Sequence, residues 1–246
     1  MSKRFLASRL FIALDFTEGK LALELAKTLS PLGVGFKIGM QLYYAEGPAI
    51  IQALKPFSDS IFVDLKLHDI PNTVSGAVDS LVRGGATLIN VHTQGGTAMM
   101  RAAVTQAKTT AEALTVKAPS IVGVTVLTSL NQQVLSSELG VNAHPLNSYV
   151  VHLAGLARQN GLDGVVCSAH EAPLVEAACG QNFLRITPGI RPAGSAVNDQ
   201  SRSITPVEAL NNGATHLVIG RPITTHKNPL VATEKILTEI NALTAV

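Results

Sequence analysis

The chain has 246 residues, of which 46% are hydrophobic and 15% are charged, and its formal net charge is +2. This length suits one complete (β/α)8 barrel, and the composition is that of a globular protein, which excludes a disordered chain. The small net charge, with no basic run, gives no support for a partner that is a nucleic acid or an acidic membrane surface.

The N-terminal segment has a basic start and a short apolar run, but Asp15 interrupts that run. A signal peptide is therefore not expected, and no stretch of about 18 uninterrupted apolar residues predicts a transmembrane helix. Cys167 and Cys179 form no CxxC pair, and no histidine cluster has metal-ligand spacing, so we interpret both cysteines as small apolar core residues. The sequence is typical of a soluble, cytoplasmic protein that holds no metal.

Short apolar runs alternate with helix-periodic segments from one end of the chain to the other. Such runs are typical of parallel strands buried on both faces, and eight of them with helices between are what one closed barrel requires. The expected strands are residues 10–14, 33–38, 61–65, 87–91, 121–126, 164–167, 183–186 and 216–219. Because no linker or composition shift divides the chain, we predict an α/β fold, a single-domain (β/α)8 TIM barrel over residues 1–246.

Two of the intervening segments show the helical pattern well. Residues 72–83 place apolar side chains on one stripe, with Asn72 as the N-cap and Gly84 at the end. Residues 145–160 start with Pro145 in the first turn and stop before a glycine.

Two connections are longer than an ordinary loop. Residues 129–144 carry a short helical pattern of their own, and residues 192–202 are small and polar. Both follow the C-terminal end of a predicted strand, which is the side where barrel enzymes carry their chemistry.

Four ionisable residues lie at the ends of predicted strands instead of on helix faces. Asp15 and Lys37 end the first two runs, and Asp64 and Lys66 end the third. Strand side chains alternate, so Asp64 and Lys66 should point the same way. Because the first three strands are neighbours in a barrel, we expect all four charges to meet at one mouth. Asp69 follows in the turn before the next helix.

Two interpretations of these charges stay open at this point. They could form an ion-pair network that only ties strand ends together, because unpaired buried charges are costly. Alternatively, the alternation Lys37, Asp64, Lys66 and Asp69 is a preorganised field for a reaction in which negative charge moves between atoms. A lysine held between carboxylates stays protonated, so it can act as an acid but not as the amine nucleophile of a Schiff-base aldolase.

The ends of the last two predicted strands indicate a phosphate site. The seventh run leads into Arg191, and the eighth leads into Gly220 and Arg221. Barrel loops at these positions commonly bind phosphate, and each arginine offers a planar fork of donors. Gly220 lets the backbone approach closely, and Gln200 in the polar loop could reach the same anion on loop closure.

The residues at these positions match a known family. The stretch 64–73, DLKLHDIPNT, resembles the DxKxxDIPNT signature of bacterial orotidine 5'-phosphate decarboxylases. Shorter motifs fall in the order and spacing of that family: FKIG at 36–39, VTVLTS at 124–129, TPGIR at 187–191 and GRP at 220–222. The resemblance covers essentially the whole chain, without a departure at any motif position.

This resemblance implies decarboxylation of orotidine 5'-phosphate to UMP, the last step of de novo pyrimidine synthesis, without a metal or organic cofactor. It makes Lys66 the acid that protonates pyrimidine C6 and places Asp64 against the substrate carboxylate. It further implies a homodimer in which Asp69 and Thr73 reach the partner's site. The remaining substrate-binding residues that it implies are Asp15, Lys37 and Asp69 at the ribose, Thr128 at the pyrimidine, Arg191, Gln200, Gly220 and Arg221 at the phosphate, and Ile70 and Pro188.

The chemistry explains why charges are needed. Loss of carbon dioxide from C6 leaves a carbanion in an sp2 orbital that no adjacent π-system delocalises. Without a cofactor as electron sink, the protein must stabilise this charge electrostatically, and a fixed ammonium can do so before it gives up its proton. For the nearby histidines we expect no catalysis: a packing role for His68 and a structural hydrogen bond for His92.

Two alternatives differ from this interpretation. Sugar-phosphate decarboxylases of the same superfamily, such as 3-keto-L-gulonate 6-phosphate decarboxylase, share an Asp-x-Lys-x-x-Asp motif. They use Mg²⁺ and carry an acidic residue in place of Lys37, and a lysine there would repel the metal. A catalytically silent, nucleotide-binding barrel is the second alternative, and turnover of substrate would exclude it.

Overall fold

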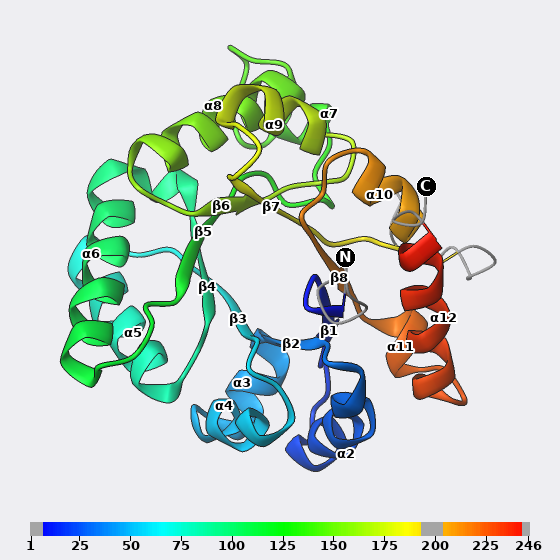
Figure 1. Cartoon of the computed structure of the whole chain (residues 1–246). Coiled ribbons are helices and arrows are strands. Elements are labelled where there is room, and N and C mark those ends of the chain that lie inside the picture. Colours follow the sequence, from blue (N-terminus) through cyan, green and yellow to red (C-terminus); the bar gives the residue numbers. More distant parts are fainter. Residues whose placement is uncertain (1–6, 193–203, 243–246) are drawn as a thin grey trace.

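The computed structural model describes residues 7–192 and 204–242, in which eight parallel strands close into a barrel in chain order. All eight predicted strands are confirmed, with ends that differ by a residue or two. Helices surround the barrel as an outer ring (Figure 1). The strands are β1 (Leu10–Ala13), β2 (Gly35–Gly39), β3 (Ile61–Leu67), β4 (Leu88–His92), β5 (Ser120–Val124), β6 (Gly164–Val166), β7 (Leu184–Thr187) and β8 (His216–Ile219).

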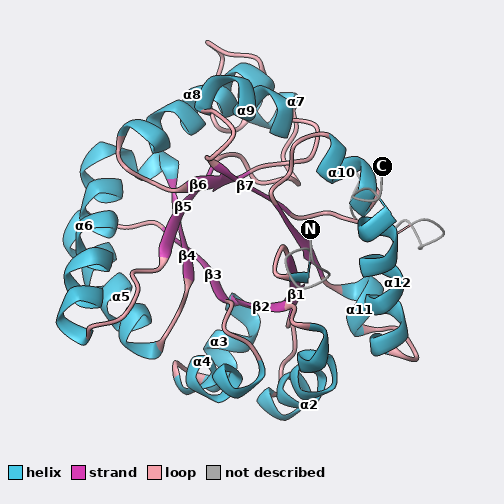
Figure 2. Ribbon diagram, in the orientation of Figure 1, coloured by secondary structure: helices cyan, strands magenta, loops and turns pink. Residues whose placement is uncertain are grey.

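The helices follow the strands in regular alternation, and extra short helices occur after several of them (Figure 2). The helical pattern expected in residues 129–144 is confirmed as α7. The α-helices are α2 (Gly19–Leu29), α3 (Met40–Glu46), α4 (Ala49–Leu54), α5 (Pro71–Gly84), α6 (Gly96–Leu114), α7 (Gln132–Ser137), α8 (Leu146–Gln159), α9 (Ala172–Cys179), α10 (Pro206–Asn211), α11 (Arg221–Thr224) and α12 (Pro229–Ala242), with 3-10 turns η1 (Ser30–Leu32), η2 (Lys55–Phe57) and η3 (Thr93–Gly95).

The ends of two helices differ from the predictions. Helix α5 has Ile70 as its N-cap and Pro71 in the first turn, so the assignment of Asn72 as the cap was wrong. Proline suits that position because its fixed φ is helical and the first turn needs no N–H donor. The helix ends at a left-handed Gly85 with φ 93°, one residue later than expected. At α8, Pro145 is the N-cap and not a first-turn residue.

The core has two parts, as a barrel requires. The larger part lies between the strands and the surrounding helices. The smaller part fills the barrel itself and consists of Phe11, Ala13, Phe62, Leu88, Val122, Ile186 and Val218. The rings of Phe11 and Phe62 meet edge to face with their centroids 5.7 Å apart. Because side chains fill the barrel, it has no open channel for a ligand through its centre.

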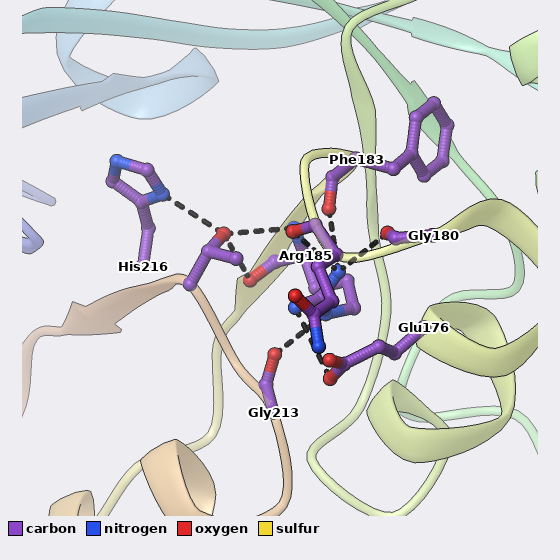
Figure 3. A network of polar contacts seen from close by, with 8 residues as sticks. Glu176, Gly180, Phe183, Arg185, Gly213 and His216 are labelled. Atoms are coloured by element: carbon purple, nitrogen blue, oxygen red, sulfur yellow. Dashed lines mark hydrogen bonds and ion pairs between the residues drawn. The ribbon is translucent and has the colours of Figure 1, made fainter.

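A buried arginine ties the beginnings of β7 and β8 together (Figure 3). Arg185 is 3% exposed, and its guanidinium donates to the carbonyls of Gly213 (2.6 Å) and Phe183 (2.7 Å). Its Nη2 also lies 3.2 Å from Oε2 of Glu176. These bonds satisfy the buried charge, and they hold the two strands whose opposite ends carry the predicted phosphate residues.

Across residues 7–192 and 204–242, none of the helices has the length and apolar character needed to span a membrane. In the same part of the chain, no cluster of three or more His, Cys, Asp or Glu side chains is arranged to hold a metal ion.

Candidate active site

A cavity of about 420 Å³ opens at the C-terminal ends of the strands, where the sequence predicted the chemistry. Its floor includes Ala13, Phe62 and Val218 from the barrel interior. The other lining residues are Asp15, Lys37, Gly39, Met40, Gln41, Asp64, Lys66, Thr128, Val166, Pro188, Gly189, Arg191, Gly220 and Arg221. A larger cavity of about 710 Å³ lies between η1 and α12, but among the described residues that line it Glu234 is the only ionisable one. Charge, and not size, therefore distinguishes the cavity at the mouth.

Four charged side chains form a chain of alternating sign across one wall of this cavity. The Lys37 Nζ lies 3.0 Å from Oδ1 of Asp15 and 3.4 Å from Oδ2 of Asp64. The Lys66 Nζ lies 2.7 Å from Oδ1 of Asp64. The prediction that these charges meet at one mouth is confirmed, and we call Asp15, Lys37, Asp64 and Lys66 the charge ladder.

The ladder is deeply set at its centre and open at one end. The side chains of Lys37 and Asp64 are 8% and 14% exposed, whereas that of Asp15 is 54% exposed. Gly39 leaves room for the Lys37–Asp15 pair, because a Cβ there would lie 2.9 Å from the Lys37 Nζ and 2.8 Å from Oδ1 of Asp15. Only glycine fits this position without moving the pair.

Lys66 reaches the ladder from an irregular stretch of strand. Its φ is 52°, in the left-handed region, and the pairing of β3 with β4 shifts register between Val63 and Leu67. Simple alternation therefore predicted the correct neighbours, although the strand does not alternate regularly there. A residue with a side chain is disfavoured in this conformation, so surrounding contacts must hold it.

Asn90 provides such contacts, and sequence reasoning missed it. This β4 residue is fully buried, and its side chain bridges the ladder and the irregular strand. Its Nδ2 donates to Oδ1 of Asp64 over 2.6 Å, and its Oδ1 accepts from the backbone N–H of Lys66 over 2.8 Å. The sequence feature that could have identified Asn90 is its position inside a mainly apolar strand, where a buried polar side chain needs hydrogen-bond partners.

The predicted phosphate residues line the same cavity on the β7 and β8 side. Arg191 follows β7, and its backbone N–H donates to the carbonyl of Ile204 over 2.9 Å. Gly220 and Arg221 follow β8 directly, and a Cβ at Gly220 would lie 3.4 Å from the Cβ of Ala13. Pro188 and Thr128 are also in the lining, and Gln200 lies outside the described residues. One cavity therefore joins the charge ladder to two arginines.

Three residues implied by the family resemblance are not in the lining of this cavity. Asp69, Ile70 and Thr73 are exposed, and the side chain of Ile70 is 66% accessible. The Asp69 carboxylate accepts the N–H of Ile70 over 2.7 Å. Within one chain the alternating array thus runs from Asp15 to Lys66 and does not continue to Asp69.

The two nearby histidines pack against each other beside the ladder. The ring centroids of His68 and His92 are 5.2 Å apart, which agrees with the packing role expected for His68. The Nδ1 of His92 is buried and has no hydrogen-bond partner among the described residues, so the expected structural hydrogen bond is absent at that nitrogen. Burial lowers the pKa of His92 below its ordinary value, and His68 and Lys66 lower it further. The ring is therefore kept neutral near neutral pH.

Comparison with known families shows which family the chain belongs to. Residues 8–236 match the family described as "Orotidine 5'-phosphate decarboxylase / HUMPS family". The chain belongs to this family. A protein from Alkalilimnicola ehrlichii named orotidine 5'-phosphate decarboxylase is 49% identical over 237 residues, which cover 96% of this chain and 97% of that protein. A protein of the same name from Moorella thermoacetica is 45% identical, with 94% of this chain and 92% of that protein covered.

A solved structure supports the same assignment. The orotidine 5'-phosphate decarboxylase from Lactobacillus acidophilus superposes with a TM-score of 0.83 at 36% identity and covers 95% of this chain and 99% of its own. The description of the orotidine 5'-phosphate decarboxylase / HUMPS family combines two groups. The choice between the chemistries of these two groups therefore rests on the charge ladder, which has Lys37 at its buried centre.

Proposed function

We propose that this chain catalyses the decarboxylation of orotidine 5'-phosphate to UMP and carbon dioxide, without a metal or organic cofactor. The observation that carries the proposal is a single cavity that holds two ammonium and two carboxylate groups on one wall and two arginines beyond them. Relatives that are 44–49% identical over nearly the whole chain bear the name of this activity. The presence of Lys37 makes the Mg²⁺-dependent alternative less favourable, because its ammonium would repel a metal ion bound beside Asp15 and Asp64.

Lys66 is the proton donor in this proposal. The bond between C6 and the carboxylate carbon breaks, its electron pair stays on C6, and carbon dioxide leaves. An N–H of the Lys66 ammonium then supplies the proton that forms the new C–H bond, and solvent reprotonates the amine. The pairing of Lys66 with Asp64 at 2.7 Å holds the ammonium in position for this step.

The neighbouring charges act on the substrate before and during this step. Asp64 lies beside the Lys66 ammonium, so a bound substrate carboxylate would meet a like charge that disappears as carbon dioxide departs. Lys37 sits between Asp64 and Asp15, where it can bind ribose hydroxyls together with Asp15. Thr128 and Pro188 would contact the pyrimidine end of the cavity.

Phosphate binding anchors the substrate away from the reacting carbon. Arg191 and Arg221 would grip the phosphate with charge-assisted hydrogen bonds, and Gly220 would allow its close approach. The sequence also assigns Gln200 to this anion. Binding energy from a remote phosphate can hold the reacting atoms in position and so lower the barrier.

We further propose that the enzyme is a homodimer in which Asp69, Ile70 and Thr73 complete the partner's site. Their exposure supports this, because these residues of the signature motif, among them the 66%-exposed Ile70, are not in the lining of this chain's own cavity. We also propose a cytoplasmic location, which the two free and buried cysteines support.

The test is turnover by the purified protein after treatment with EDTA. Addition of orotidine 5'-phosphate should give the ultraviolet change of UMP formation at a rate that added Mg²⁺ does not increase. Turnover that requires Mg²⁺ would contradict decarboxylation without a metal. No turnover would favour a silent nucleotide-binding barrel, and either result would overturn the proposal.

A further inference from the structure

We propose that Asn90 is a positioning residue that locks Asp64 and Lys66 into the geometry needed for proton delivery. This inference rests on the proposed decarboxylation and adds a residue of β4 to its machinery. Asn90 does not line the cavity, so it acts through the two ladder residues and not on the substrate.

The bridge that Asn90 makes has only one workable orientation. A carboxylate oxygen can only accept a hydrogen bond, and a backbone N–H can only donate one. The amide nitrogen of Asn90 must therefore face Asp64, and its oxygen must face Lys66, as the 2.6 Å and 2.8 Å contacts require. Of the similarly sized side chains, leucine can make neither bond, and an ionised aspartate can make only the one to Lys66.

The bond to the backbone of Lys66 holds an otherwise unfavourable conformation. Lys66 has a φ of 52° where β3 loses its regular register with β4. Without this bond the irregular segment would be free to leave its left-handed backbone conformation, and the Lys66 ammonium would lose its fixed position relative to Asp64. The Oδ1 of Asn90 keeps the irregular segment against β4.

The bond to Asp64 fixes the direction of the carboxylate. Its Oδ1 receives both the Lys66 ammonium at 2.7 Å and the Asn90 amide at 2.6 Å. This arrangement leaves Oδ2 for Lys37 at 3.4 Å. Because Asn90 is fully buried, its amide has no solvent contact that could replace either bond. One amide thus sets both the backbone of the proton donor and the orientation of its counter-ion.

The variants that test this are Asn90→Leu, which makes neither bond, and Asn90→Asp, which keeps the shape. Asn160→Leu and Asn160→Asp are matched controls. Asn160 is also buried, and its Nδ2 donates a hydrogen bond to the carbonyl of Leu156 over 2.8 Å, but it does not line the cavity. At neutral pH both Asn90 variants should lose roughly 10- to 100-fold in kcat, the effect expected of a hydrogen bond to a charged group, with KM near its native value. The Asn160 variants should keep the native kcat.

The pH profile separates positioning from mere folding. In Asn90→Asp the new carboxyl group can donate to Asp64 when protonated, but it repels Asp64 when ionised. The ratio of its kcat to the native kcat should therefore fall as the pH rises, whereas a purely structural defect would give the same ratio at every pH. A constant ratio, or a native kcat in Asn90→Leu, would overturn the inference.

A second measurement does not depend on turnover. The backbone N–H of Lys66 should exchange with solvent at least about tenfold faster in Asn90→Leu than in the native protein, and at the native rate in Asn160→Leu. Unchanged exchange in Asn90→Leu would also overturn the inference. Failure of the proposed function is a different result, since the native protein itself would then not turn over orotidine 5'-phosphate.

Discussion

Lys37 should be coupled more strongly to Asp64 than to Asp15, although it lies closer to Asp15. The separations are 3.4 Å and 3.0 Å, but the Asp64 side chain is 14% exposed and that of Asp15 is 54% exposed. With an effective dielectric constant of ~20 at Asp64 the gross attraction is about 5 kcal/mol, and with ~80 at Asp15 it is about 1.4 kcal/mol. Burial therefore outweighs the difference in distance.

Desolvation reduces both values before they appear in the free energy of unfolding. Asp64 also keeps Lys66 and Asn90 as partners when Lys37 is lost, which limits the damage. We expect a coupling free energy of about 2 kcal/mol for Lys37 with Asp64 and below about 1 kcal/mol for Lys37 with Asp15.

Double-mutant cycles measured by urea unfolding check these values. The substitutions are Lys37→Met combined with Asp64→Asn or with Asp15→Asn. The surface pair Arg83–Asp79, whose side chains are 54% and 30% exposed, is the control and should couple more weakly than Lys37 with Asp64, because solvent screens exposed charges. A coupling to Asp15 equal to or larger than that to Asp64 would refute the view that the buried centre holds the ladder together.

Three further predictions concern other parts of the molecule. Arg191→Ala should raise KM for orotidine 5'-phosphate by roughly 10- to 100-fold, and steady-state kinetics should show almost no effect on unphosphorylated orotidine; equal effects on both would remove the phosphate role. Arg185→Met should lower the free energy of unfolding by about 2–4 kcal/mol, because Glu176 and several carbonyls lose a buried partner, while KM stays unchanged. Burial, with a smaller contribution from Arg9, lowers the pKa of His216 to about 4. Between this value and the ordinary pKa of ~6.5, the unfolded chain binds more protons at this residue than the folded chain does. The stabilisation that the neutral ring contributes should therefore be fully present above pH ~6.5. As the pH drops toward 4, the free energy of unfolding should fall by up to about 3 kcal/mol. His216→Gln should flatten this dependence in urea titrations, and an unchanged slope would contradict the assignment.

The sequence predicted the barrel well because parallel strands that are buried on both faces give short apolar runs in the sequence. Most residues of the eight strands are apolar, so the few charged residues near the strand ends stand out. The convergence of Asp15, Lys37, Asp64 and Lys66 followed from strand order alone. Helix ends were less predictable, since Pro71 starts α5 one residue before the expected cap.

What the sequence did not predict depends on contacts between distant segments. The left-handed backbone of Lys66 and the register shift of β3 arise where two strands meet, so no local sequence pattern predicts them. The bridge by Asn90 joins residues 24 and 26 positions apart. The roles proposed for Asp69 and Thr73 would need a second chain, and they stay predictions.

The most direct test of cofactor-free decarboxylation by the charge ladder is the Lys66→Ala variant. Its turnover of orotidine 5'-phosphate and its affinity for UMP should be measured on the same EDTA-treated preparation. The proposed proton transfer from Lys66 predicts that turnover disappears while UMP still binds with nearly native affinity, because the residues proposed to bind the phosphate and ribose are other residues of the cavity lining. Turnover that persists near the native rate would contradict it.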